Sequence, residues 1–259
     1  MRRCLGTYLT ILVLCAGAAA SQAAARAQAA DRVALENKRV VLVRTGRLAR
    51  QFPERRTAVV NYPFVKSFPD RAVLHKLRAM LLVQNIFETS LAQYRQDAWL
   101  TEFDYVVNYN KHHILDISFY QSGVGAYPDT HTRHFAISLK TGEMLRARDV
   151  FRAETLETLA GLVNARLRAE VKQISDEISR DTDIDADAKD AVKETLSELR
   201  FTVENLDEFM VDERGVTFMF DAGFPHVIEA LEPEGDYLFS YAQLAPYIKR
   251  DGLLQRFVR

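Results

Sequence analysis

Four histidines are the residues whose type and spacing come nearest to a metal-ligating set. His112 and His113 are adjacent, and His131 and His134 flank a Thr-Arg pair further along the chain. Imidazole nitrogens on neighbouring strands can ligate zinc. However, His131 and His134 are three residues apart on an extended segment, so their side chains point to opposite faces. Ordinary surface histidines are the better interpretation, and we predict no metal and no cofactor.

An acidic stretch offers a weak calcium candidate. Asp183, Asp185 and Asp187 alternate, and Glu194 takes the twelfth position counted from Asp183, which is the spacing of a calcium-binding loop. The sixth position is Ala188, where such a loop needs glycine for its sharp turn. The simpler interpretation is an acidic connection between two helices, with Asp185 or Asp187 capping the second helix.

A polar, glycine-containing segment between residues 120 and 131 is the strongest candidate for recognition. Tyr127 and Arg133 are of types favoured at the centres of interfaces, and Asp129 and His131 lie between them. We therefore predict that Tyr127, Asp129, His131 and Arg133 bind a ligand or partner. The alternative is a connecting loop whose glycines satisfy backbone geometry.

Catalysis has less support. Ser118, Ser122 and Ser138 are the serines nearest to a histidine, and none lies in the G-x-S-x-G pattern of a hydrolase nucleophile. No catalytic residue is predicted, so the enzyme class stays open, with a non-enzymatic protein preferred.

The elements that must position these residues follow from hydrophobic periodicity. We expect a tight turn at Asn110-Lys111, and we expect Asp70 to cap a helix. Trp99 is expected in the core. Strands and helices occur in blocks, which favours an α+β fold: an antiparallel sheet with one long and several shorter helices packed on it. Predicted strands are 40–43, 57–62, 103–109, 114–119, 134–139, 201–203, 209–211, 216–220 and 236–241, and predicted helices are 70–94, 155–180, 188–199 and 242–248.

The first 29 residues have the order of a cleavable secretory signal peptide. Arg2 and Arg3 precede an apolar stretch, and an alanine-rich tract ends at Ala27-Gln28-Ala29. A retained membrane anchor and a lipid-modified Cys15 are the alternatives. The apolar stretch is short for a bilayer span, and a leucine directly before Cys15 does not suit lipoprotein processing. We expect a periplasmic or secreted protein with no membrane span after cleavage.

Composition restricts the classes of partner and of covalent chemistry. Residues 30–259 carry 31 basic and 35 acidic side chains, a net charge of −4, because the leader holds three arginines and no acid. A mildly acidic surface argues against a nucleic-acid partner. Both cysteines, Cys4 and Cys15, lie in the leader, so we expect no disulfide and no cysteine metal site beyond it.

The order of several motifs resembles the extracellular domain shared by the anti-sigma factor RsiV and the peptidoglycan deacetylase PdaC (domain of unknown function 3298). The motifs are Tyr105–Asn110, Ile114–Phe119, Gly125-Ala126-Tyr127, Thr141-Gly142, Asp149-Val150-Phe151, Phe201–Val203, Phe218–Phe220 and Tyr241–Leu244. The resemblance implies one domain over residues 30–259, with an N-terminal strand-helix segment at 30–98 and the main sheet and helices at 99–259. It also implies an envelope-facing setting, since this domain binds lysozyme in one relative and accompanies a deacetylase in the other.

Three hypotheses for function follow. The preferred one is an exported, non-enzymatic binding or sensor-type domain of the cell envelope, whose ligand is a lysozyme-like protein or peptidoglycan. The alternatives are an envelope hydrolase acting on cell-wall glycan and a structural partner of another envelope protein.

Overall fold

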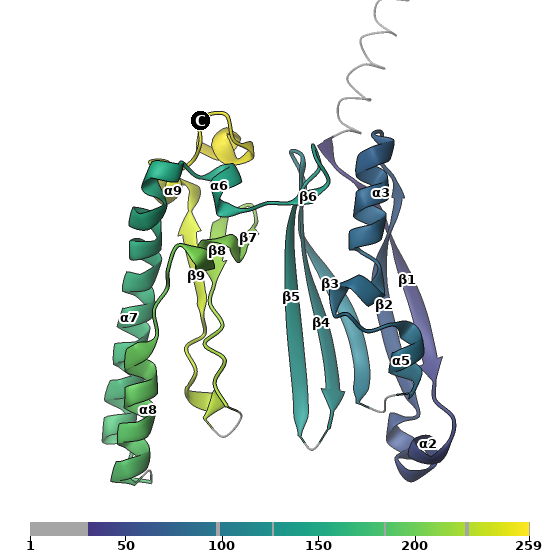
Figure 1. Ribbon diagram of the computed structural model, residues 1–259, viewed down its shortest axis with the longest axis horizontal. Helices are drawn as coiled ribbons and strands as arrows, with labels where there is room; N and C mark the ends of the chain where they lie inside the picture. The colour runs from purple at the N-terminus through teal and green to yellow at the C-terminus, as the bar shows by residue number, and fades with distance from the viewer. Residues whose placement is uncertain (1–30, 97–98, 126, 184, 226–227, 259) are drawn as a thin grey trace, which may run out of the picture. The chain divides into compact units, whose positions relative to one another are not determined.

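A computed structural model describes residues 31–96, 99–125, 127–183, 185–225 and 228–258. The predicted signal peptide, residues 1–29, lies outside the described residues. The chain forms two compact units, and Figure 1 labels the strands and most of the helices. Of the described residues, unit 1 takes those from 31 to 133 together with 137–143, and unit 2 takes 134–136 together with those from 144 to 258.

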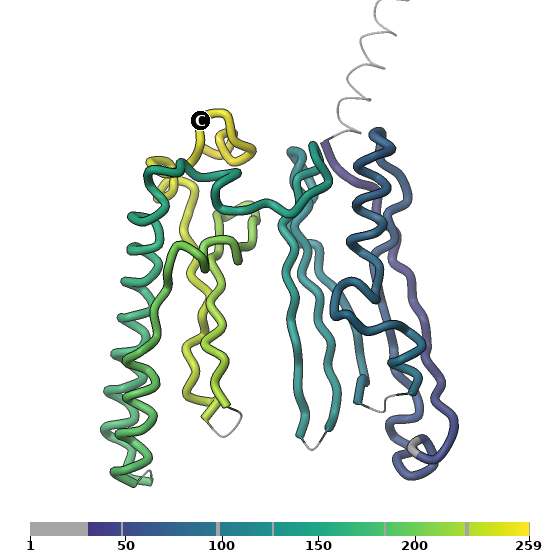
Figure 2. The backbone as a smooth tube through the Cα atoms, in the orientation of Figure 1, coloured from purple at the N-terminus to yellow at the C-terminus, as the bar shows by residue number. Residues whose placement is uncertain are grey.

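Unit 1 is built on a six-stranded sheet in which each strand neighbours the next in sequence, in the order β1-β2-β3-β4-β5-β6. β1 with β2 and β3 with β4 are antiparallel pairs, whereas β2 and β3 run parallel at Val59↔Glu102 and Val60↔Phe103. The long β3–β4 hairpin can be followed along the backbone in Figure 2. The strands are β1 Ala34–Val43, β2 Thr57–Ser67, β3 Leu100–Lys111, β4 Ile114–Val124, β5 Pro128–Ser138 and β6 Glu143–Met144.

Short helices supply the remaining elements of unit 1. The predicted helix at 70–94 is divided into α3 Arg71–Met80, α4 Val83–Ile86 and α5 Leu91–Gln96. Its predicted start is confirmed, because the Asp70 carboxylate accepts hydrogen bonds from the N–H groups of Ala72 and Val73. The first break comes at Leu82, whose backbone is extended. α2 Arg47–Gln51 and a 3₁₀ turn Pro53–Arg55 precede β2.

The core of unit 1 lies between the sheet and these helices. Phe103 and Phe119, on paired strands, are completely buried with ring centroids 6.3 Å apart, and Phe87 meets Phe103 edge-on at 5.6 Å. Leu77 of α3 is completely buried, and Leu81, directly after α3, is nearly so. Burial of such side chains contributes about 1.5–3 kcal/mol each, so this layer fixes which face of β3 and β4 is left to carry polar residues.

The turn between β3 and β4 lies two residues later than predicted. His112 and His113 occupy it with φ values of 58° and 62°, and left-handed backbone at both central residues is what a tight hairpin turn requires. Asn110, predicted as a turn residue, pairs instead with Val33: its amide accepts from the Val33 N–H at 2.9 Å and donates to the Val33 carbonyl at 2.8 Å.

The proline at 63 does not end the second predicted strand. β2 continues through it to Ser67, and residue 63 pairs with Asn37 of β1. The pairing of β2 with β3 involves only Val59 and Val60, so a proline beyond them interrupts no bond on that side.

Unit 2 packs a long helix on a three-stranded antiparallel sheet. The sheet contains β7 Phe209–Val211, β8 Gly215–Met219 and β9 Asp236–Ser240 in that order. The helices are α6 Ala147–Val150, α7 Leu156–Arg180, α8 Ala186–Glu198 and α9 Tyr241–Leu244, with 3₁₀ turns at Ala153–Thr155, Glu204–Asp207, Glu229–Leu231 and Leu253–Val258. The Arg166 guanidinium of α7 lies 3.8 Å from the ring of Phe239, and the Tyr237 hydroxyl donates to Glu170 of α7.

Most of the predicted elements of unit 2 are confirmed. α7 follows the predicted periodicity, and Asp185 caps α8 by accepting a hydrogen bond from the Ala188 N–H at 2.9 Å. The predicted strand at 201–203 is wrong. There the Asn205 side chain accepts from the N–H and hydroxyl of Thr202, and the chain enters a 3₁₀ turn.

The α+β class is confirmed, with two sheets in place of the one expected. The predicted boundary at 98/99 falls within one sheet, because β1 and β2 before it and β3 after it belong to the same six-stranded sheet. A single domain over 30–259 stays a prediction. None of the helices in the described ranges is long and apolar enough to cross a membrane.

Candidate functional site

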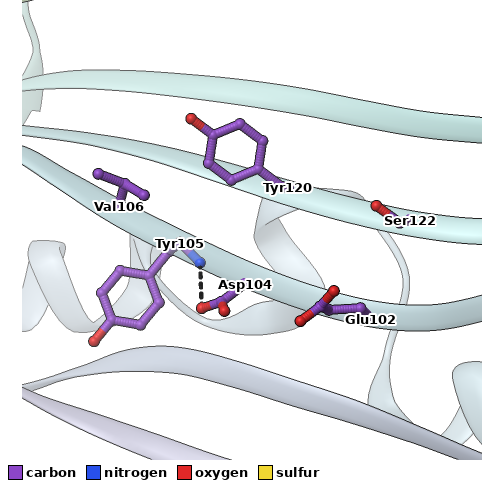
Figure 3. Close-up of a pocket in the computed structure, with 6 residues that line it drawn as sticks. All are labelled: Glu102, Asp104, Tyr105, Val106, Tyr120 and Ser122. Carbon is purple, nitrogen blue, oxygen red and sulfur yellow. Dashed lines mark hydrogen bonds between the residues drawn. The ribbon is translucent and has the colours of Figure 1, made fainter.

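A hollow of about 260 Å³ lies on the face of β3 and β4 opposite the phenylalanine core. Figure 3 shows the side chains that line it: Glu102, Asp104, Tyr105, Val106, Tyr120 and Ser122. Strand register explains why they meet, because Glu102 pairs with Ser122 and Asp104 with Tyr120. Alternation along each strand sends Phe103 and Phe119 to the core and their even-numbered neighbours to this face.

Some polar groups of the hollow have hydrogen-bond partners within the protein and others do not. The Asp104 carboxylate accepts hydrogen bonds from the Asn61 amide at 3.2 Å and from the Tyr105 N–H at 2.8 Å, the second drawn in Figure 3. In the described parts of the chain, the Glu102 carboxylate and the Tyr120 hydroxyl have no hydrogen-bond partner. Tyr105 pairs with Phe119, so its ring lies on the core side, 6.2 Å from the Phe119 ring, where burial and then the charge of Asp104 raise the pKa of its phenol.

These groups suit a ligand rich in hydroxyls. Carboxylate oxygens accept hydrogen bonds from hydroxyl groups, and the ring of Tyr120, 36% exposed, offers an apolar face beside them. An open hollow with one aromatic wall and a few acceptors can orient one sugar-sized group.

A hydrogen bond connects the hollow to β5. The Ser122 and Thr130 hydroxyls are 3.0 Å apart, which places Thr130 on the same face as the hollow. Alternation then sends Asp129, His131 and Arg133 to the opposite face of β5. Three of the four predicted binding residues therefore share one face of an edge segment.

The predicted binding residues lie on the most exposed part of this sheet. Every residue from Pro128 to Arg133 is exposed, and 64% of Tyr127 just before them is accessible to solvent. His131 Nε2 lies 3.1 Å from a carboxylate oxygen of Asp129. Its ring also lies 5.3 Å from the ring of Trp99, at an interplanar angle of 31°.

Trp99 is the residue of this surface that sequence reasoning assigned to the core. It is only half-buried, and its ring covers Gly123: a Cβ added at Gly123 would lie 2.5 Å from the Trp99 ring. Glycine at 123 is therefore needed for close packing of the indole. The two glycines at 123 and 125, both of which lie against Trp99, are the feature of the sequence from which this contact could have been predicted.

The remaining histidines do not gather around His131. His112 and His113 form the β3–β4 turn, where the Tyr109 hydroxyl bonds to His112 Nδ1 and His113 Nε2 lies 3.9 Å from Asp31. His134 belongs to the half-buried part of β5. Within the described ranges, no three His, Cys, Asp or Glu residues come together as metal ligands.

The acidic stretch follows a helical path instead of a twelve-residue loop. Asp185 caps α8, Asp187 lies in its first turn, and Glu194 lies further along the same helix. Asp183 precedes the cap, and its N–H donates to the Asp181 carboxylate at 2.7 Å. A calcium loop needs these positions to wrap around one point, which residues on a straight helix do not do.

The three serines have partners other than histidine. The Ser118 hydroxyl lies 2.8 Å from the Asn108 amide, Ser122 contacts Thr130 as described, and Ser138 accepts from the Lys140 N–H at 3.3 Å.

Comparisons with known proteins place the fold. No family model and no curated protein matches the sequence. Among solved structures, the chain is similar to a member of the DUF3298 family from Bacteroides fragilis, with a TM-score of 0.55, 14% identity, and coverage of 88% of this chain and 98% of that one. A DUF3298 family protein from Pseudomonas aeruginosa gives a TM-score of 0.55 and 15% identity, covering 87% and 98%. The resemblance inferred from sequence motifs is thus confirmed for the fold.

Proposed function

We propose that this chain is an exported binding domain of the cell envelope, and that a protein partner docks on the first half of β5. The leader supports export, since its charged, apolar and small-residue regions follow the secretory order. The envelope setting is what the motif resemblance implies, and the DUF3298 structures support that resemblance at the level of the fold.

The observation that carries the proposal is the exposed run Pro128–Arg133 at the sheet edge. β6, the strand beyond β5, spans only Glu143–Met144, and the following Leu145 donates to the Ala136 carbonyl. β6 therefore runs beside only the C-terminal half of β5, and the N-terminal half of β5, Pro128–Arg133, extends past it. An uncovered edge segment can take an added strand from a partner through main-chain hydrogen bonds.

Side chains around this edge supply specificity. Tyr127, Trp99 and Arg133 are of the types that contribute most to binding energy at interfaces. The rings of Trp99 and His131 already contact each other, so little side-chain entropy is lost when a partner covers them. The net charge of −4 over residues 30–259 favours encounter with a basic protein, such as one of the lysozyme type.

The hollow of Figure 3 favours a second candidate, the binding of cell-wall glycan. The observation behind it is the exposed Tyr120 ring beside the unpartnered carboxylate of Glu102. Both candidates use unit 1 but opposite faces of it, because Thr130 is bonded to Ser122 on the side of the hollow and Asp129, His131 and Arg133 point the other way.

Retention assays separate the candidates. Full-length chain lacking only the leader is tested for binding to immobilised c-type lysozyme and for co-sedimentation with purified peptidoglycan. The protein-binding proposal predicts retention on lysozyme that falls at least tenfold in the Tyr127→Ala/Arg133→Glu variant. The matched control is Arg47→Glu, an exposed charge reversal in α2 of the same unit.

The glycan candidate predicts co-sedimentation that Tyr120→Ala abolishes and Tyr127→Ala/Arg133→Glu does not. Release of soluble sugar fragments during the assay would favour the hydrolase alternative. Retention on neither ligand would overturn the proposal.

A further inference from the structure

An apolar groove of about 320 Å³ lies elsewhere in unit 1, between β2 and α3. Its walls include Tyr62 and Phe64 of β2, His75 and Arg78 of α3, and Leu82 just after α3. The lining is almost wholly apolar apart from the His75 and Arg78 heads. The volume falls in the range of ligand pockets, about 300–1,000 Å³.

Two large apolar side chains of this groove are exposed. Phe64 is 38% and Leu82 47% accessible to solvent. Leu82 is held outward by the break between α3 and α4, where its φ and ψ are −66° and 133°. Neighbouring exposed apolar side chains are costly in water and mark binding surfaces when they lie together.

Arg78 is fixed over the groove with part of its guanidinium unused. Nε donates to the Val65 carbonyl at 2.9 Å and Nη2 to the Lys66 carbonyl at 3.0 Å, and the group lies 5.2 Å from the Phe64 ring centroid. No carboxylate in the described ranges pairs with Arg78, and Nη1 has no partner there. The backbone carbonyls hold the cation in place without neutralising it.

The other charges near the groove leave it cationic. Lys38, 5.4 Å from the Phe64 ring centroid, forms an ion pair with Glu36, so these two cancel. Glu36 of β1 pairs in register with Phe64 of β2, which places this carboxylate next to the groove. Lys66, exposed beside Val65, also acts on Glu36, so Lys38, Lys66 and Arg78 outnumber this acid three to one.

We infer that this groove binds a single-chain anionic amphiphile. The acyl chain lies along Tyr62, Phe64 and Leu82, and a carboxylate or phosphate head accepts hydrogen bonds from Nη1 of Arg78. An apolar channel ending at a prepositioned cation fits an acyl chain with an anionic head better than it fits a peptide, whose backbone needs several polar partners. The inference is independent of the proposed function, because β2 is three strands from β5 in the sheet.

Calorimetric titration of the full chain with dodecanoate, below its micellar concentration, tests the inference. Affinity is expected to rise about fourfold per methylene from octanoate until the groove is full. Dodecyl phosphate is expected to bind comparably, and dodecyltrimethylammonium at least tenfold more weakly.

Two variants locate the ligand. Arg78→Gln is expected to weaken dodecanoate binding about tenfold, while Arg71→Gln, an exposed arginine of the same helix without a partner in the described ranges, has no effect. Leu82→Asp, also at an exposed position, is expected to abolish binding without loss of folding. Unchanged affinity in Arg78→Gln and Leu82→Asp would overturn the inference. Binding to phosphatidylglycerol vesicles without any binding of monomeric dodecanoate would also overturn it.

Discussion

Arg44 and Arg78 are both held by hydrogen bonds from the guanidinium to backbone carbonyls, and they differ in burial and in how many of their nitrogens donate. Arg44 is 2% exposed, and its guanidinium donates to the carbonyls of Tyr94, Arg55 and Leu100 at 3.1, 2.7 and 2.6 Å. Arg78 is exposed and donates to two carbonyls, and its Nη1 has no partner among the residues that the structure describes. A buried guanidinium whose three nitrogens all donate to backbone carbonyls holds the fold together, and an exposed one with a nitrogen to spare is available to a ligand.

The same contrast divides β5. Its second half is flanked by β6 and includes the buried residues Ala136 and Ile137. Its first half, Pro128–Arg133, is exposed throughout. We therefore expect substitutions of residues that are buried and hydrogen-bonded within the protein to alter stability. Substitutions of exposed residues with unused hydrogen-bonding groups should alter binding.

The largest expected effect is at Arg44. Arg44→Met leaves three backbone carbonyls without donors, and we expect a loss of about 3–5 kcal/mol in the free energy of unfolding. Urea unfolding followed by circular dichroism measures it as a shift of the midpoint. A loss below about 1 kcal/mol would show that these bonds are replaced by water.

The next effect is on binding at the β5 edge. Tyr127→Ala is expected to cost about 1–2 kcal/mol of affinity for the protein partner, because a large exposed ring is buried on docking. The unfolding midpoint should stay unchanged. A loss of unfolding free energy as large as the loss of binding free energy would show that Tyr127 stabilises the fold and does not act mainly in binding.

A pair of carboxylates extends the comparison to acids. Asp212 accepts hydrogen bonds from the backbone N–H groups of Arg214 and Gly215 in the β7–β8 turn and from the Arg214 side chain, whereas Glu102 has no partner within the described ranges. We expect Asp212→Asn to cost about 1 kcal/mol and Glu102→Gln almost nothing. Unfolding of both variants in urea at neutral pH checks the difference, and equal losses would contradict it.

Asp212 also gives a pH dependence with a definite sign. Burial acts to raise its pKa, but the hydrogen bonds from Arg214 and Gly215 outweigh it and lower the pKa below its ordinary value. A carboxyl whose pKa is lower in the folded chain stabilises above the unfolded value of about 4 and loses that contribution as pH falls through the folded pKa. Asp212→Asn should remove this part of the acid destabilisation, as seen in unfolding midpoints below pH 4.

The smallest expected effect is that of Arg78 on stability. Arg78→Gln should change the free energy of unfolding by no more than about 1 kcal/mol, because water can replace its bonds at an exposed site. A loss matching that of Arg44→Met would remove the distinction between the two arginines.

Sequence patterns predicted the features that depend on local chemistry. The periodicity of α7 and the caps at Asp70 and Asp185 arise from residues within a turn or two of each other, and all three are confirmed. The segment around Tyr127 is exposed, and the binding role inferred for it from residue types stays a prediction.

Features set by distant residues were missed. The β3–β4 turn shifts because Asn110 is engaged by Val33. Trp99 is only half-buried because Gly123, near the end of β4, admits its ring against the backbone. The apolar groove has no local signature, since it arises where β2 and a broken α3–α4 helix approach each other.

Hydrogen–deuterium exchange of the full chain with and without c-type lysozyme tests the central claim most directly. If a partner adds a strand to β5, amide exchange slows in residues 128–133, while the already buried strand residues 114–119 stay unchanged. Binding that protects other segments and leaves 128–133 exchanging as in the free chain would contradict the account, as would the absence of any binding.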